Sequence, residues 1–126
     1  MEHSTKVALD TNVLLSIEKF KVDVFTQLRE QFGKVEFIVP KSVVEELEKL
    51  GSSNKTMKKS ANVALELLRK NRAKTVEKTG KSADEDLLEL SQNAWIATSD
   101  KKLLKKVLQR QGRVLILRQK KFMQAN

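Results

Sequence analysis

Short apolar runs alternate with longer amphipathic segments along nearly the whole chain, and this alternation is the strongest constraint on its fold. The runs at residues 6–9 and 35–39 are rich in Val, Ile and Leu, and their length is typical of buried strands. The longer segments, such as residues 22–32, repeat apolar residues at helical spacing. Strands that alternate with helices form a parallel sheet covered on both faces. The sequence therefore predicts an α/β fold, a three-layer α/β/α sandwich with a central, largely parallel sheet.

The same patterns give the expected order of elements. Further strands are expected at residues 73–77, 95–98 and 114–117. Helices are expected at residues 13–20, 22–32, 42–50, 57–70, 82–93 and 101–111, with a polar loop at residues 51–55. The length of 126 residues suits one core, so we expect a single domain over residues 1–126 that ends in a basic tail from about residue 118.

The composition excludes several classes of protein. With no Cys and one His, the chain cannot form disulfides, thiolate zinc sites or a His-based catalytic triad. Its four glycines do not form a phosphate-binding loop, which argues against a dinucleotide-binding or Walker A site. No apolar run approaches the roughly 20 residues that span a bilayer, and no signal peptide is visible. We expect a cytoplasmic protein with no membrane partner.

The net charge of +9 is concentrated at the C-terminal end of the chain. After Asp100 there is no acidic residue but there are nine basic ones, while the residues before it are balanced. A one-sided basic segment is typical of a polyanion partner, and solubility alone is the alternative. The residues expected to contact such a polyanion are Lys101, Lys102, Lys105, Lys106, Arg110, Arg118, Lys120 and Lys121.

Two acidic residues follow apolar runs. Asp10 ends the first predicted strand, and Asp100 follows the strand at residues 95–98. The carboxyl ends of parallel strands form the ligand crevice of open α/β folds. Asn12 can cap the next helix and leave Asp10 free, whereas Asp100 is also compatible with a plain N-cap.

Two more acidic residues lie beside the apolar faces of predicted helices. Ser42 and Glu45 fit a capping box, which leaves Glu46 next to the apolar face without a structural role. Asp84 is favoured over Asp86 because it shares a face with the following leucines, although either acid also suits the positive end of a helix dipole.

Carboxylates that converge in one crevice repel one another unless a cation neutralises them. Oxygen ligands favour a hard divalent cation such as Mg²⁺ or Mn²⁺, which activates water and offsets the charge of a phosphate. The catalytic and metal-binding acids expected on this basis are Asp10, Glu46, Asp84 and Asp100. Hydrogen bonds to these acids or to a phosphate are expected from Thr11, Asn12, Thr98 and Ser99.

Four short motifs resemble those of the PIN-domain nucleases. They are the stretch Leu9 to Asn12, the stretch Val39 to Leu47, the stretch Ala83 to Leu88 and the stretch Ala97 to Leu103. Ser99 stands where the family often has Asn. The resemblance covers nearly the whole chain and places the functional acids at the same four positions. It implies Mg²⁺- or Mn²⁺-dependent cleavage of single-stranded RNA, and a homodimer through the first helical pair.

Within this family, the chain looks closest to small PIN proteins related to the ribosomal-RNA-processing endonucleases of small-subunit assembly. One alternative is the ribonuclease toxin of a toxin–antitoxin pair, with an antitoxin as protein partner. Another is a non-catalytic RNA-binding assembly module that works with ribosome-assembly proteins. The presence of all four acids argues against this last alternative.

Overall fold

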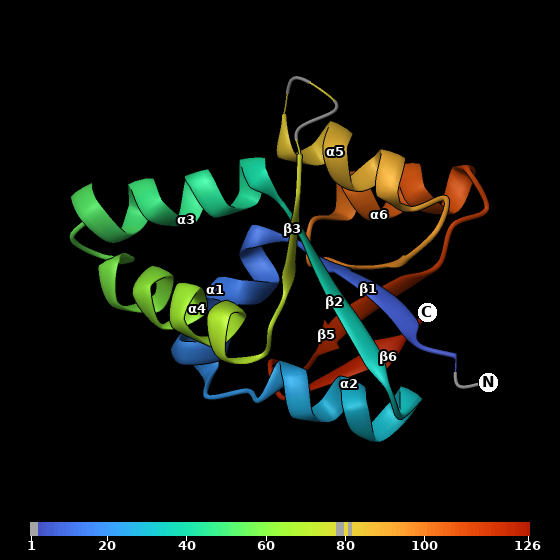
Figure 1. The fold of residues 1–126 in the computed structure, drawn as a ribbon, viewed down its shortest axis with the longest axis horizontal. Helices are drawn as coiled ribbons and strands as arrows, with labels where there is room; N and C mark the ends of the chain where they lie inside the picture. Colours follow the sequence, from blue (N-terminus) through green and yellow to red (C-terminus); the bar gives the residue numbers. More distant parts are fainter. Residues whose placement is uncertain (1–2, 78–79, 81) are drawn as a thin grey trace.

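A six-stranded sheet forms the centre of the computed structural model, which describes residues 3–77, 80 and 82–126 (Figure 1). The strand order is β3-β2-β1-β4-β5-β6. The strands are β1 (Thr5–Leu9), β2 (Val35–Pro40), β3 (Lys74–Val76), β4 (Trp95–Ala97), β5 (Val114–Arg118) and β6 (Phe122–Ala125). All neighbours pair in parallel except β5 and β6, so the largely parallel sheet is confirmed.

Helices cover both faces of this sheet, which confirms the three-layer prediction. They are α1 (Thr11–Phe20), α2 (Val24–Phe32), α3 (Lys41–Ser53), α4 (Lys58–Lys70), α5 (Ala83–Leu90) and α6 (Lys101–Gln109). Figure 1 shows α5 and α6 on one side of the sheet and α1, α2 and α4 on the other. Helix α3 lies along α4 and begins next to α5.

The hydrophobic core is built from the apolar runs of the sequence. Val7, Ala8 and Leu9 of β1 are fully buried, because the central strand is covered on both faces. Phe25 of α2 packs edge-on against Phe37 of β2, with 4.7 Å between ring centroids. This contact packs α2 against β2.

The predicted basic tail is wrong, because the segment after residue 118 turns back and forms β6. Met123 is buried, and the side chain of Gln27 on α2 holds this strand by bonds to the Lys121 carbonyl (2.8 Å) and the Met123 amide (2.7 Å). Only one residue of β6 is buried, so the apolar alternation that would reveal a strand is absent.

The loop expected at residues 51–55 is also partly wrong. Helix α3 continues to Ser53, and Gly51 is buried inside it. A Cβ at Gly51 would lie 2.4 Å from the side-chain oxygen of Asn62, so glycine permits the close approach of α3 and α4. In the described part of the chain, no helix is long and apolar enough to cross a membrane.

Candidate active site

The strand order of the sheet changes direction between its two central strands, β1 and β4. From β1 it continues to β2 and β3 on one side, and the later strands β4, β5 and β6 lie on the other. Such a switch point leaves a crevice at the carboxyl ends of the two central strands. Asp10 follows β1 and Asp100 follows β4 by three residues, so both acids lie at this crevice.

All four predicted acids line one pocket of about 300 Å³ at this point. Asp10 and Asp100 come from the ends of strands, Glu46 comes from α3, and Asp84 comes from the first turn of α5. The other lining residues are Thr11, Asn12, Ser82 and Ala83. Sequence reasoning missed Ser82 and Ala83, although the N-cap position of Ser82 is a local signal that the chain turns there.

Asp10 is almost fully buried and accepts two hydrogen bonds. The backbone amide of Thr11 donates to Oδ1, and the hydroxyl of Thr98 donates to Oδ2, both at 2.7 Å. Asp10 is therefore the N-cap of α1, and the prediction that Asn12 caps this helix is wrong. The side chain is already held in one orientation before any ligand binds.

Burial is the main cause that raises the pKa of Asp10 above its ordinary value. The bonds from Thr98 and Thr11 oppose this shift, whereas the negative charges of Asp84 and Asp100 add to it. The carboxylate is thus costly in its charged form, and a bound cation would lower that cost.

Asp84 and Glu46 are exposed, in contrast to the expectation that they lean toward the core. Partial desolvation is the first cause that raises the pKa of Asp84, followed by the charge of Asp100. Lys106 on α6 opposes the shift, and Glu46 adds to it. The charges of Asp100 and Glu46 therefore act on the Asp84 carboxylate within this pocket.

Asp86, the acid favoured less from the sequence, is buried and lies outside the acid pocket. Its carboxylate accepts bonds of 2.6 Å from the Ser42 hydroxyl and from the Gly80 amide. It therefore joins α5 to the start of α3. The capping box expected at Ser42 is wrong, because α3 follows Pro40 without a side-chain cap, whereas Ser82 does cap α5.

Asp100 lies at the pocket and also caps α6. The two interpretations of this residue, as a site acid and as an N-cap, are therefore compatible. The Lys102 amide donates to its carboxylate at 2.9 Å. Its own amide donates to the Thr98 hydroxyl at 3.0 Å. Thr98 therefore connects the ends of β1 and β4 through a single hydroxyl group.

The remaining polar candidates lie in different places. The Thr11 hydroxyl is buried, and among the described residues it is the one buried side-chain oxygen or nitrogen without a hydrogen-bond partner. Asn12 lines the acid pocket and also a second, neighbouring pocket. Ser99, which precedes Asp100 in the chain, lines only this second pocket.

The donor set of the acid pocket fits a hard divalent cation. Its ligands would be carboxylate oxygens, and burial, with the charges of neighbouring carboxylates as a smaller cause, raises the pKa of Asp10 and of Asp84. No three acidic side chains of the described residues are close enough to hold one ion together. The arrangement therefore suits an ion held by one or two carboxylates, with water and substrate oxygens completing its shell, as is usual for Mg²⁺.

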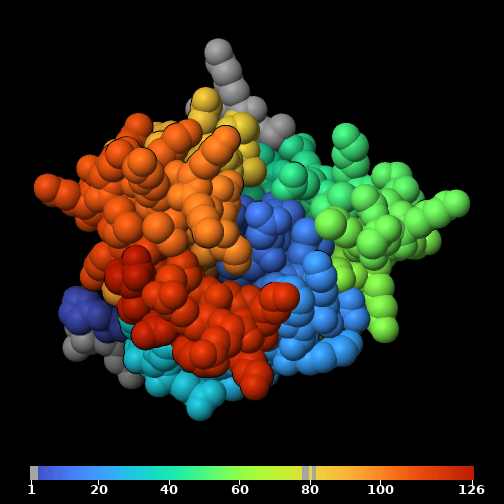
Figure 2. Space-filling view, turned by 180° about the vertical axis from the view of Figure 1, so that it is seen from behind, coloured from blue at the N-terminus to red at the C-terminus, as the bar shows by residue number. Residues whose placement is uncertain are grey.

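The eight basic residues predicted to contact RNA are all exposed, but they do not form one cluster. Lys101 and Lys102 begin α6 beside Asp100, and Lys105 and Lys106 lie one turn further. Arg118, Lys120 and Lys121 lie at the turn between β5 and β6, on the same edge of the sheet. Arg110 ends α6 at the opposite end. Figure 2 shows α6 in orange and the β5–β6 hairpin in red next to each other, with α1 in blue beside both.

A family model and two named relatives match most of this chain. The family model described as "PIN like domain" matches residues 7–120. The protein named "Ribonuclease VapC4" of Methanocaldococcus jannaschii is 31% identical over 122 residues, which cover 93% of each chain. "Ribonuclease VapC9" of Archaeoglobus fulgidus is 39% identical over 105 residues, which cover 81% of this chain and 75% of the relative.

Two solved structures have a similar fold. The PIN domain endonuclease Utp24 has a TM-score of 0.79 and 24% identity, and the match covers 96% of this chain and 90% of that one. A domain of a functionally unknown protein from Methanocaldococcus jannaschii has a TM-score of 0.64 and 18% identity, with 90% and 91% covered. Because the family model spans most of the chain and two relatives are more than 30% identical, the chain belongs to the PIN-like domain family, as its four motifs predict.

Proposed function

We propose that this protein is a divalent-metal-dependent endoribonuclease that cleaves single-stranded RNA. The observation that carries the proposal is the convergence of Asp10, Glu46, Asp84 and Asp100 in one pocket at the β1/β4 switch point. The two relatives named as ribonucleases support RNA as the substrate. The exposed basic residues on α6 and on the β5–β6 turn support a polyanion there.

Asp10 and its neighbours would hold Mg²⁺ or Mn²⁺. Asp10 is the best candidate for a direct ligand, because its carboxylate is buried and oriented by Thr11 and Thr98. Asp84 and Asp100 would complete the set directly or through water, and Glu46 would orient a water molecule or bind a second ion. A bound divalent cation would supply Lewis-acid activation of water and neutralise the attacked phosphate.

The decisive experiment follows cleavage of a labelled single-stranded RNA with Mg²⁺, with Mn²⁺ and with EDTA. We expect cleavage only with metal, and loss of at least about 100-fold in Asp10→Asn, on the scale of altering a metal site. Glu46→Gln should lose activity, whereas Glu45→Gln, one residue away on the same helix, should retain it. Cleavage that persists in EDTA, or at the wild-type rate in Asp10→Asn, would refute the proposal.

Two biological roles are compatible with this activity. Processing of ribosomal RNA during small-subunit assembly is one, and a ribonuclease toxin neutralised by an antitoxin is the other. The sequence identity to two VapC ribonucleases favours the toxin, since the likeness to Utp24 establishes the fold alone. Expression of the chain should then arrest growth, Asp10→Asn should not, and a small protein encoded beside it should relieve the arrest. Light scattering would test the homodimer expected from the family resemblance.

A further inference from the structure

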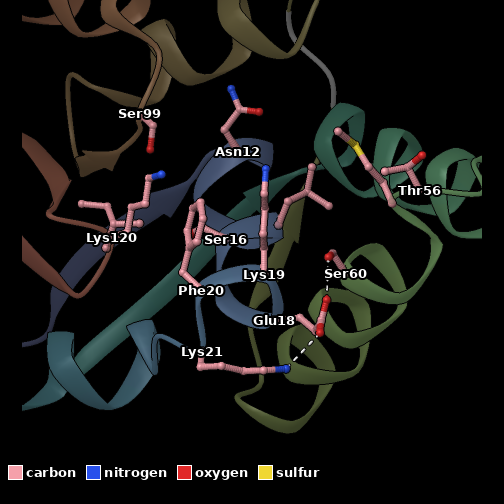
Figure 3. Close-up of a pocket in the computed structure, with 13 residues that line it drawn as sticks. Asn12, Ser16, Glu18, Lys19, Phe20, Lys21, Thr56, Ser60, Ser99 and Lys120 are labelled. Carbon is pink, nitrogen blue, oxygen red and sulfur yellow. Dashed lines mark hydrogen bonds and ion pairs between the residues drawn. The ribbon is translucent and has the colours of Figure 1, made fainter.

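A second pocket of about 640 Å³ adjoins the acid pocket. Asn12 lines both pockets, and Ser99, which precedes the pocket acid Asp100, lines the second one. Residues of α1, of the start of α4 and of the β5–β6 hairpin form its walls (Figure 3). A chain bound at the acids can therefore continue into this pocket without a break in the surface.

The lining of the second pocket combines an apolar interior with cations. Leu15, Phe20 and Leu117 contribute apolar surface, and Met57 at its edge is 39% exposed. The cations are Lys19, Lys21 and Lys120. A nucleobase is flat and apolar on its faces and is joined to phosphates, so it matches this combination in both polarity and charge.

Phe20 is the aromatic group of this pocket. The ammonium nitrogens of Lys19 and Lys120 lie 5.3 Å and 5.0 Å from the centroid of its half-buried ring. Aromatic rings that stack bases, together with lysines that track the backbone, are the usual means of binding single-stranded nucleic acid. The two lysines come from α1 and from the β5–β6 turn, so they lie on different walls of the pocket.

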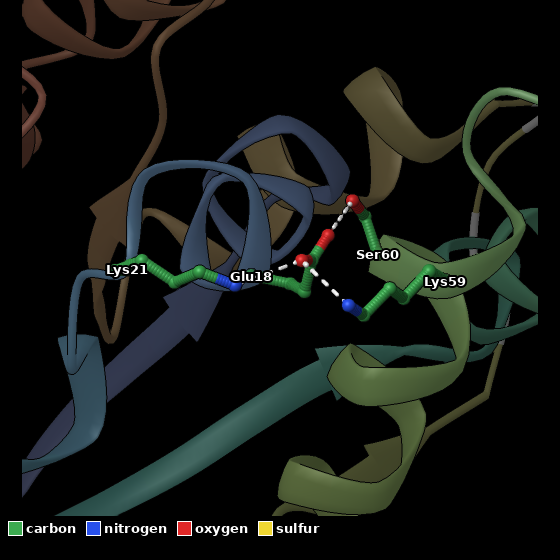
Figure 4. Close-up of polar contacts among 4 residues, drawn as sticks. All are labelled: Glu18, Lys21, Lys59 and Ser60. Atoms are coloured by element: carbon green, nitrogen blue, oxygen red, sulfur yellow. Dashed lines mark hydrogen bonds and ion pairs between the residues drawn. The ribbon is translucent and has the colours of Figure 1, made fainter.

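One wall of the pocket is held in place by Glu18. The Ser60 hydroxyl donates to its carboxylate at 2.8 Å, and the ammonium groups of Lys21 and Lys59 lie 3.0 Å and 3.7 Å from it (Figure 4). The contacts from Ser60 and Lys59 join α1 to α4 across the pocket edge. The pocket is therefore preformed, which lowers the entropic cost of ordering a ligand there.

We propose that the second pocket binds one unpaired nucleobase of the substrate RNA, adjacent to the phosphate at the four acids. The base stacks on Phe20, while Lys19 and Lys120 contact the flanking phosphates. This inference rests on the proposed function, because it places the base next to the cleaved phosphate. A protein side chain is the competing occupant, and the experiment below separates the two.

The test measures binding of labelled single-stranded oligoribonucleotides to the wild-type chain in EDTA, where no cleavage is expected. Each nucleotide is replaced in turn by an abasic one. We expect one position at which the abasic change weakens binding about 5- to 150-fold, the range for loss of one base–aromatic stack. That position should lie within one or two nucleotides of the phosphate that is cut when metal is added.

Variants then assign the effect to the pocket. In Phe20→Leu the position-specific loss should disappear, whereas in Phe122→Leu, an exposed phenylalanine outside the pocket, it should remain. Lys120→Gln should weaken binding of every oligonucleotide and reduce the salt slope by about one, while the matched control Lys6→Gln should change neither.

Three results would overturn the inference. The abasic change could weaken binding equally at every position, which is a flat scan; binding could be undetectable; or the position-specific loss could remain in Phe20→Leu. A pocket that serves a protein partner would give the flat scan. If Phe20→Leu fails to fold, the comparison of Lys120→Gln with Lys6→Gln still tests whether the RNA binds at this pocket. Because the scan measures binding and the Asp10→Asn assay measures cleavage, failure of the base pocket and failure of the nuclease proposal give different results.

Discussion

The hydroxyl of Thr98 donates a 2.7 Å hydrogen bond to the carboxylate of Asp10, although the two residues are 88 positions apart in the chain. The same hydroxyl accepts a bond from the amide of Asp100. Thr98 thus fixes the two strand ends that carry two of the four pocket acids. Its side chain is fully buried, so water cannot replace it.

Thr98→Val should keep the shape of the side chain and remove both bonds. The Asp10 carboxylate and the Asp100 amide then lose a partner, which should cost about 1–3 kcal/mol in the free energy of unfolding. Loss of an orienting group should also lower cleavage about 10- to 100-fold. Denaturant unfolding and cleavage assays measure the two effects. Thr98→Ser retains the hydroxyl and should remain close to wild type in both; losses in Ser without losses in Val would assign the effect to packing.

The raised pKa of Asp10 predicts how stability depends on pH without metal. Its folded carboxyl group holds a proton more tightly than the unfolded one, whose ordinary pKa is 3.8. Above that value the unfolded chain loses its proton first, so this group lowers stability as pH rises toward the folded pKa. Asp10→Asn removes this cost. In EDTA, the melting temperature of Asp10→Asn minus that of wild type should therefore increase from pH 4 to pH 8. A difference that is constant with pH would contradict the raised pKa of Asp10.

Asp84 and Asp86, two residues apart on α5, should behave in opposite ways. Asp86→Ala leaves the Ser42 hydroxyl and the Gly80 amide without their acceptor and should cost about 1–3 kcal/mol of unfolding free energy. Asp84→Ala removes an exposed acid and should change stability by less than about 0.5 kcal/mol while it abolishes cleavage. Paired denaturation and cleavage measurements decide this. A stable Asp86→Ala chain without activity would move Asp86 into the active site.

Divalent metal should raise the melting temperature of the wild-type chain. A cation that binds only the folded state stabilises it by mass action, by about 2.7 kcal/mol at 100 times its Kd. The increase should vanish in Asp10→Asn and persist in Glu45→Gln. Differential scanning calorimetry with Mn²⁺, with Mg²⁺ and with EDTA gives the comparison, and no shift at excess Mn²⁺ would argue against a site in the folded chain.

The basic residues near the pocket should bind RNA without taking part in chemistry. Replacement of Lys105, Lys106, Lys120 and Lys121 with Gln should weaken binding of every RNA sequence and flatten its salt dependence by about one unit of slope per lost phosphate contact. Cleavage at saturating RNA should be nearly unchanged. An unaltered salt slope would direct attention to Lys55, Lys58 and Lys59, which line another hollow of the surface.

The alternation of apolar runs and amphipathic segments was sufficient to predict the layers and the parallel sheet. A strand segment that is buried on both faces must be apolar, and residues 7–9 of β1 and 37–39 of β2 show this in sequence. An acid directly after such a run lies at the edge of the sheet, so Asp10 and Asp100 could be placed without a structure. Strand β6 could not be predicted, because side chains of α2, and not its own pattern, hold it.

Helical spacing fixed the angle between neighbouring side chains of a helix, but only tertiary packing fixed the rotation of each helix about its axis. Helix α5 has eight residues, and its packing buries Asp86 and exposes Asp84 to the pocket, the reverse of the expected burial. The choice of Asp10 over Asn12 as the cap of α1 likewise depended on the local backbone at the end of β1. The sequence by itself determined which acids reach the crevice. The tertiary structure decided which of them are buried, which ones are bonded, and that a second pocket lies beside them, because these properties arise from contacts between segments far apart in the chain.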